Sequence, residues 1–167
     1  TQTDTQASFV QSGDTVVLGD WNGDGKTKIG VFRNGTWYLD YNGNNVWDGA
    51  VVDKQYTFGQ TGDIPMIGDW NGNGKTKIGL FRAGVWYLDT NGDGVWDNGV
   101  ADTQASFGQS GDIPVVGDWS GNKQSKIGLF RNGQWYLDYD GNKVWDDGVV
   151  DKLYSFGQTG DVPVVAD

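Results

Sequence analysis

The 167-residue sequence contains no cysteine and no histidine. Without cysteine the chain can form no disulfide, no thiolate zinc site and no cysteine nucleophile. The lack of histidine removes the most common general base and the most common ligand of transition metals. Disulfide stapling, zinc–thiolate sites and histidine-based chemistry are therefore excluded.

Basic residues are few, with 12 against 22 acidic residues and a net charge of −10. A nucleic-acid-binding protein needs a basic surface that displaces the counterions of phosphates, and an anionic membrane surface makes a similar demand. No apolar run approaches the ~20 residues of a membrane span. We therefore expect no nucleic-acid partner and no membrane insertion, whereas the many carboxylates favour a hard cation.

Glycine and aromatic residues are abundant, with 28 glycines and an aromatic content of 14%. Such a composition is not that of a disordered chain, which has few aromatic residues. A 49-residue period orders these residues: Trp37, Trp86 and Trp135 are evenly spaced by it. A fixed period of this size indicates stacked supersecondary units, so the core is expected to extend along the stack.

One repeat predicts four strands and no helix. In the second repeat the strand candidates are 64–68, 77–82, 85–89 and 103–107. The dipeptides Asn34-Gly35 and Asn132-Gly133 are typical of type I′ hairpin turns, which need positive φ at both positions. Bulky residues on both faces of the strands favour sheets that are packed on both sides. The predicted fold is all-β, with tandem four-stranded antiparallel blades of 49-residue period, as in a β-propeller.

We expect a single repeat domain over 1–167, with full repeats at 14–62, 63–111 and 112–160. Residues 1–13 match only the end of a repeat, including the strand Ala7-Ser8-Phe9, and residues 161–167 match only a beginning. Three blades are too few to close a ring, and open blades expose apolar faces and strand edges. The expected partners are therefore other copies of the chain or further repeats of a longer chain.

Each repeat has an acidic loop after its third strand that suits Ca²⁺. In the second repeat this loop offers side-chain oxygens at positions 1, 3, 5 and 9, glycine at position 6 and a backbone carbonyl at position 7. Ca²⁺ takes ~6–8 oxygen ligands, and this spacing can wrap a short loop around one ion. The candidate ligands are Asp89, Asn91, Asp93, Val95 (through its carbonyl) and Asp97; Asp40, Asn42, Asn44 and Asp48; and Asp138, Asp140, Asn142 and Asp146.

A second acidic loop follows the first strand of each repeat. In the first repeat it offers Asp20, Asn22 and Asp24, but Lys28 stands at position 9. This loop can bind Ca²⁺, or the lysine ammonium can take the place of the metal. Plain turn chemistry is the competing interpretation for both kinds of loop, because Asp, Asn and Gly favour turns.

A bound ion would be structural. Extracellular modules bind Ca²⁺ at ~0.1–1 mM, so millimolar Ca²⁺ adds roughly 0.4–1.4 kcal/mol of stability per site. Such an ion stabilises a marginally stable domain and drives no reaction.

Nine tryptophans, three per repeat, raise the question of sugar binding. Those within strands (Trp37, Trp86 and Trp135) are expected in the core between blades. The candidates for exposed stacking platforms are Trp47, Trp96 and Trp145, at position 8 of the calcium-type loops, together with Trp21, Trp70 and Trp119. Core packing is the competing interpretation for these six.

The acidic residues predict no enzyme. A catalytic site needs several different roles and therefore breaks a repeat. Almost all acids of this chain recur with the period, at positions that turns or Ca²⁺ explain.

Residues 19–26 read Gly-Asp-Trp-Asn-Gly-Asp-Gly-Lys, residues 29–32 read Ile-Gly-Val-Phe, and the repeat closes on Phe58-Gly59. This combination resembles FG-GAP/VCBS-type repeats, the blade units of integrin α-subunit propellers and of many secreted bacterial and archaeal proteins. The resemblance implies calcium at Asp20, Asn22 and Asp24, although Lys28 departs from the acid that is usual in the family. It also implies a propeller that serves adhesion or acts as a scaffold.

Together these features predict a non-catalytic module, extracellular or on the cell surface. We expect a calcium-stabilised propeller for adhesion or for binding a surface glycan or protein. A self-assembling subunit of an extracellular filament or coat is the alternative, which the near-equivalence of the repeats favours. Lectin-type glycan binding through rim tryptophans is a further possibility.

Overall fold

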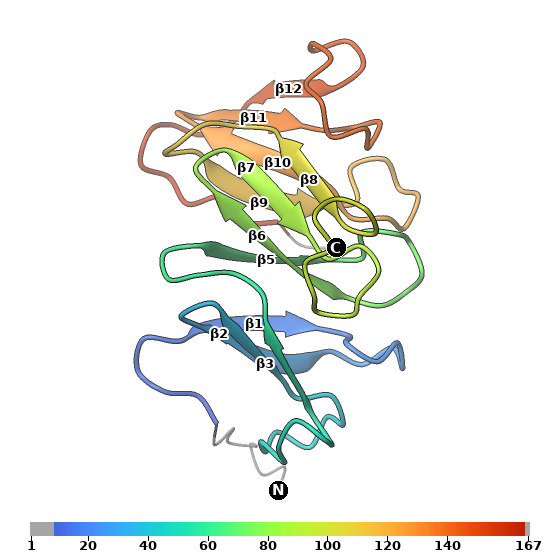
Figure 1. Ribbon diagram of the computed structural model, residues 1–167. Coiled ribbons are helices and arrows are strands. Elements are labelled where there is room, and N and C mark those ends of the chain that lie inside the picture. The colour runs from blue at the N-terminus through green and yellow to red at the C-terminus, as the bar shows by residue number, and fades with distance from the viewer. Residues whose placement is uncertain (1–8, 166–167) are drawn as a thin grey trace, which may run out of the picture.

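A computed structural model describes residues 9–165. Within them, twelve strands form three four-stranded antiparallel sheets and there is no helix. Each sheet contains four consecutive strands, and neighbours in the chain are neighbours in the sheet. The sheets stack in chain order and do not close into a ring (Figure 1). The predicted all-β, β-propeller-like arrangement of tandem blades is thereby confirmed, and we call the sheets blades 1 to 3.

The strand bounds repeat with the 49-residue period. Blade 1 contains β1 (Thr15–Gly19), β2 (Lys28–Arg33), β3 (Thr36–Leu39) and β4 (Lys54–Thr57). Blade 2 contains β5 (Ile64–Gly68), β6 (Lys77–Arg82), β7 (Val85–Leu88) and β8 (Thr103–Ser106). Blade 3 contains β9 (Ile113–Gly117), β10 (Lys126–Arg131), β11 (Gln134–Leu137) and β12 (Lys152–Ser155). All four strands predicted for the second repeat are confirmed to within one residue.

The hairpin between the second and third strands has the predicted turn. Asn34 and Gly35 have φ values of +50° and +88°, and Asn132 and Gly133 have +51° and +80°. Ala83 takes the place of the asparagine in blade 2 and keeps the left-handed value of +49°.

The core lies between blades. In its first part, Trp37, Leu39 and Phe58 of blade 1 pack against Ile78 and Leu80 of blade 2. The second part repeats this packing between blades 2 and 3, with Ile127 and Leu129 as the covering residues. Trp37 and Trp86 are completely buried, as expected. Trp135, on the outer face of blade 3, is only half-buried.

In each blade an arginine of the second strand pairs with an aspartate of the turn that precedes the blade. Arg82 donates from Nε and Nη2 to the two carboxylate oxygens of Asp63, at 2.5 and 2.7 Å. Its guanidinium also lies over the ring of Tyr87, 5.0 Å from the centroid. Arg33 with Asp14 and Arg131 with Asp112 make the same pairs. Paired, hydrogen-bonded geometry of this kind is what a buried carboxylate requires.

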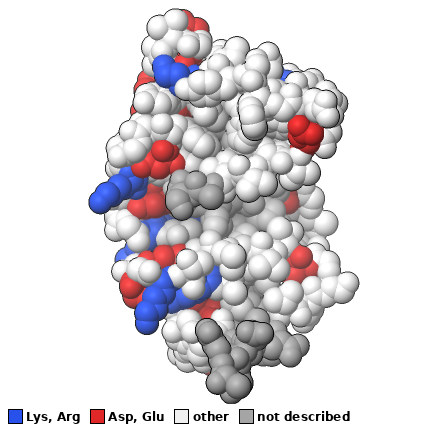
Figure 2. Space-filling view, turned by 180° about the vertical axis from the view of Figure 1, so that it is seen from behind, with Lys and Arg blue, Asp and Glu red and all other residues white. Residues whose placement is uncertain are grey.

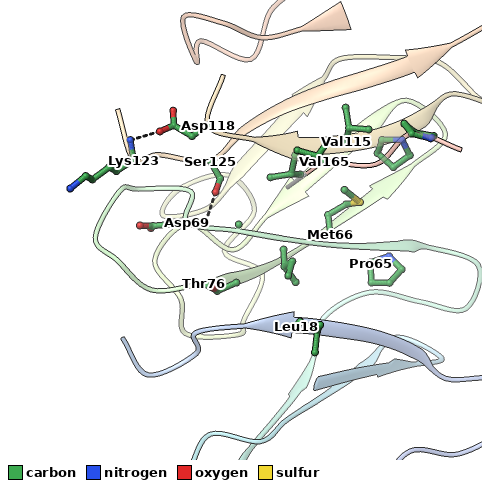
Figure 3. A pocket seen from close by; sticks show the side chains of 15 residues that line it. Leu18, Pro65, Met66, Asp69, Thr76, Val115, Asp118, Lys123, Ser125 and Val165 are labelled. Atoms are coloured by element: carbon green, nitrogen blue, oxygen red, sulfur yellow. Dashed lines mark hydrogen bonds between the residues drawn. The ribbon is translucent and has the colours of Figure 1, made fainter. Parts of the chain in front are cut away.

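A hollow of about 850 Å³ runs along the first strands of the blades (Figure 3). Leu18, Met66 and Val115 line it from β1, β5 and β9, and Val165 lies in it from the end of the described chain. Of the strand predicted at Ala7-Ser8-Phe9, only Phe9 belongs to the described residues. Residues 9–165 contain no helix with the length and apolar character needed to cross a membrane.

Candidate metal centres in the blade loops

The two acidic loops of each blade lie side by side. We call residues 20–28, 69–77 and 118–126 the lysine loops, and residues 40–48, 89–97 and 138–146 the acid loops. Asn22 of a lysine loop donates from Nδ2 to the carbonyl of Tyr41, within the acid loop of the same blade, at 3.2 Å. A Cβ placed on Gly43 would lie 3.3 Å from Cε of Lys28. Figure 2 shows charged side chains gathered along one flank of the stack.

Each lysine loop encloses an ammonium group. Nζ of Lys28 donates to Asp24 Oδ1 at 2.6 Å, Asn22 Oδ1 at 2.8 Å, the carbonyl of Lys26 at 3.0 Å and Asp20 Oδ1 at 3.3 Å. The Lys28 side chain is only 3% exposed. Burial lowers the pKa of Lys28, but the hydrogen bonds to Asp24 and Asp20 outweigh this effect and raise the pKa above its usual value.

The other lysine loops repeat this arrangement. Nζ of Lys77 donates to Asn71 Oδ1 at 2.7 Å, and Nζ of Lys126 donates to Asn122 Oδ1 at 2.7 Å. The ammonium groups thus lie where the sequence allowed either a lysine or a metal ion. The oxygens of Asp20, Asn22 and Asp24, considered for Ca²⁺, surround the lysine because its stem runs buried beneath the loop and delivers the positive charge.

The acid loops are closed by their own hydrogen bonds. The two oxygens of Asp89 accept the backbone N–H groups of Gly92 at 2.8 Å and Gly94 at 2.9 Å. At the far end, Asp97 Oδ2 accepts Asn91 Nδ2 at 3.2 Å. Asp48 likewise accepts the side-chain amides of Asn42 and Asn44, and Asp146 accepts that of Asn142. In all three loops the aspartate at position 9 thus accepts a side-chain amide from position 3 or 5.

A further buried aspartate completes each acid loop. Asp102 accepts the N–H of Thr90 at 3.0 Å and that of Asp97 at 3.1 Å, so it joins the two ends of the loop. Asp53 and Asp151 make the same bonds and are completely buried. Sequence reasoning missed these residues. Their 49-residue recurrence just before the fourth strand was the available signal.

The third acid loop has the features of a cation site. One oxygen from each of Asp138, Asp140 and Asp151 lies within 4.8 Å of the others. Asp138 is 1% exposed, and among the described residues its Oδ2 has no hydrogen-bond partner. Burial raises the pKa of Asp138 to about 6, and it does the same for Asp89. An all-oxygen donor set with an unpaired buried carboxylate oxygen fits a hard cation such as Ca²⁺.

The sequence pattern pointed more strongly to the second acid loop, because Gly94 stands at its sixth position. Among the described residues, however, the group of three close carboxylates lies in the third loop. Gly94 has φ +76°, close to the +65° and +68° of its counterparts Asn45 and Lys143, so the turn does not require glycine. A Cβ on Gly94 would lie 2.0 Å from Cδ1 of Tyr56. This glycine is therefore needed for the packing of blade 1 on blade 2.

The tryptophans divide into buried and peripheral sets. Trp21 and Trp70 are 5% and 2% exposed, so the structure corrects their candidacy as platforms: they bury their rings and donate Nε1 to carbonyls of their own blade. Trp119, at the outer blade, is half-buried. The acid-loop tryptophans Trp47, Trp96 and Trp145 lie edge-on to Tyr38, Tyr87 and Tyr136 at 5.3–5.4 Å.

Trp145 is the most accessible of the acid-loop tryptophans, at 38% exposure. With Phe107 and Tyr136 it borders a groove of about 210 Å³.

No protein-family model, no curated protein and no solved structure matches this chain.

Proposed function

We propose that this protein is a non-catalytic, extracellular repeat module for adhesion or surface binding, with blades stabilised by Ca²⁺. The contrast between the two kinds of loop carries the proposal. Each lysine loop contains its own cation, whereas the acid loop of blade 3 groups three carboxylates and leaves Asp138 Oδ2 unpaired. Asp138, Asp140 and Asp151 would hold the ion, with Asn142 and Asp146 as adjacent donors.

Electrostatics favours an external cation at this loop. Burial disfavours the charged form of a carboxylate, which is the reason for the pKa of about 6 at Asp138. At neutral pH the group is charged nevertheless, and this charge costs stability. Ca²⁺ at the millimolar concentrations found outside cells would offset the cost, even with the weak affinity typical of extracellular modules.

The arrangement of the acids also favours a non-catalytic role. Most carboxylates of the loops recur in each blade, and they accept backbone N–H groups or bind a lysine, as Asp89 and Asp20 do. Such groups organise loops and are not arranged as an acid–base pair. The resemblance to FG-GAP/VCBS-type repeats supports adhesion as the purpose of the module.

Calorimetric titration with Ca²⁺ tests the proposal. We expect binding at ~0.1–1 mM in the wild type and its loss in Asp138→Asn, which keeps the shape of the side chain and removes its charge. Asp147→Asn is the matched control, because Asp147 is exposed and lies outside the carboxylate group. Absence of binding in the wild type, or equal binding in Asp138→Asn, would contradict the proposal.

The groove at Trp145 favours a second candidate function, glycan binding. An apolar concave surface with a few polar groups is typical of ligand sites, and Arg131 lies at the edge of this groove. The test is a glycan-array measurement on the wild type and on Trp145→Ala. Binding that disappears in the variant would support this function, and the absence of any bound glycan would contradict it.

A further inference from the structure

We call the face that a blade packs on the following blade its tail face, and the face that it packs on the preceding blade its head face. The two internal junctions show how a tail face fits a head face. At the first junction Leu80 covers Gly59: a Cβ on this glycine would lie 2.8 Å from Cδ1 of Leu80. At the second junction Leu129 covers Gly108 in the same way, at 2.9 Å. The neighbouring phenylalanines, Phe58 and Phe107, are both 3% exposed. Apolar residues at fixed repeat positions therefore interlock twice in this chain.

Two hydrogen bonds accompany each junction, one between backbone groups and one from a backbone N–H to a side-chain hydroxyl. Thr76 donates its N–H to the carbonyl of Asp20 at 2.9 Å, and its Oγ1 accepts the N–H of Asp20 at 2.9 Å. Ser125 makes the same two bonds to Asp69, at 3.0 and 2.9 Å (Figure 3). A small hydroxyl residue at this position thus aligns one blade on the next.

The tail face of blade 3 is built like the others but has no cover. Trp135 donates Nε1 to the carbonyl of Phe156 at 2.8 Å, as Trp37 does to Phe58. Phe156 is nevertheless 79% exposed, and Tyr154 is 53% exposed. The face is preformed, and it presents a large apolar surface to solvent.

The complementary head face is present on blade 1. Thr27, Ile29 and Val31 stand at the repeat positions of Thr76, Ile78 and Leu80. Thr27 is exposed and Ile29 is half-buried, whereas Ile78 is 1% exposed within its junction. Val31 is completely buried already in the monomer, so only part of the head face is open. We propose that copies of this chain associate head to tail, with the tail face of blade 3 docked on the head face of blade 1 of a second copy. Such an interface is heterologous, so it forms a ring if the rotation closes and a filament otherwise.

In the monomer, Phe9 occupies the place on blade 1 that Phe156 of a second copy would take. Phe9 lies 6.3 Å from Trp47, between ring centroids, as Phe107 lies 6.3 Å from Trp145. Val10 follows it where Gly59, Gly108 and Gly157 have φ values of +122°, +129° and +110°, which valine rarely adopts. The segment is therefore a poorer fit than Phe156-Gly157 of another copy, and a groove of about 440 Å³ remains beside Phe9.

Asn45 is a second obstacle on blade 1. It stands at the position of Gly94, over which the ring of Tyr56 packs, and the arriving copy brings Tyr154 to this place. A side chain here opposes the tyrosine ring. A Cβ at this place would lie 2.0 Å from a ring placed like that of Tyr56, so the ring of Tyr154 has to turn aside in the docked pair. Both obstacles therefore weaken the association.

Sedimentation velocity over a hundredfold range of protein concentration tests the proposal. The wild type is expected to associate as concentration rises, and Phe156→Asp and Thr27→Arg are each expected to stay monomeric. Both changed residues are exposed in the monomer, so the fold persists, which a thermal scan verifies. A mixture of the two variants is expected to form a dimer, because each retains the face that the other lacks.

Removing either obstacle is expected to tighten the association. Phe9→Ala and Asn45→Gly should each lower the dissociation constant about tenfold. Asn98→Gly is the control for the second change, since Asn98 also has positive φ but lies outside both faces. The proposal is overturned by a wild type that is monomeric at every concentration, by self-association of Thr27→Arg alone, or by a mixture that forms no dimer. These readouts need no Ca²⁺, so they are independent of the proposed function.

Discussion

Lys28 and Asp48 both occupy the ninth position of an acidic loop, and they give the two loops different electrostatic requirements. The ammonium of Lys28 is held by four oxygens, whereas Asp48 adds another negative charge to its loop. All 22 acidic residues of the chain are aspartates. The short aspartate side chain reaches the backbone N–H groups of its own turn, which explains how one residue type serves every loop.

Replacing the lysine by an apolar residue of similar length is expected to create a calcium-dependent loop. Lys28→Met leaves Asp20 and Asp24 without their cation, and we expect it to lower the Tm by about 5 °C in chelator. Millimolar Ca²⁺ should restore much of this loss. In Lys126→Met the loop keeps Asp118 as its acid beside Ser120 and Asn122, so Ca²⁺ should restore little. Equal responses of the two variants to Ca²⁺ in thermal scans would refute this assignment.

The raised pKa of Asp138 makes a prediction about pH. Because its folded pKa of about 6 exceeds the ordinary 3.8, the folded state holds this proton more tightly, and stability falls as pH rises from about 4 through 6. Asp138→Asn removes this dependence. In chelator, the Tm of the variant minus that of the wild type should be about 2–4 °C more positive at neutral pH than near pH 5. A constant difference across this range would show that Asp138 does not titrate there.

The hairpins between the second and third strands show how a local rule sets an element. Asn-Gly at 34–35 and 132–133 predicted type I′ turns, and the positive φ values confirm them. Blade 2 forms the same turn with Ala83, whose side chain has no polar group that supports the left-handed conformation. The strands on both sides impose the turn there, and some strain is the result.

Ala83→Asn is therefore expected to stabilise blade 2 by about 0.5–1 kcal/mol, or a rise in Tm of about 1–4 °C. Asn34→Ala is the reverse change at the matching turn and should lower the Tm by a similar amount. Chemical denaturation of both variants gives the measurement. A stabilising effect of Asn34→Ala would argue against strain at this position.

Strand bounds were predictable because short apolar runs and turn dipeptides act over a few residues, and the 49-residue period repeats them in each blade. The lysine loop was also predictable as one of two readings, since Lys28 and its oxygens lie within nine residues. The roles of Asp102 and Gly94 were not, because each depends on a partner brought close by folding: the two ends of a loop, and the ring of Tyr56 from the previous blade. For Trp21 and Trp70 the sequence left platform and core packing open, because their burial depends on the tertiary packing around the loop.

At the scale of the whole molecule, stability is distributed over junctions between blades and over loops at one flank. Both internal junctions use the same residue positions, so the core is shared between the two junctions. Repeat proteins of this kind gain stability from nearest-neighbour interfaces. A cation that neutralises the acid loop of one blade therefore stabilises that blade and, through the junction, the adjacent blade.

Scanning calorimetry of the wild type at neutral pH, in millimolar Ca²⁺ and then in chelator, tests the central claim most directly. With one occupied acid loop, Ca²⁺ is expected to raise the Tm by about 1–5 °C relative to chelator, and Mg²⁺ at the same concentration should raise it less. An identical Tm in Ca²⁺ and in chelator would contradict the claim that the acid loops take a cation from solution.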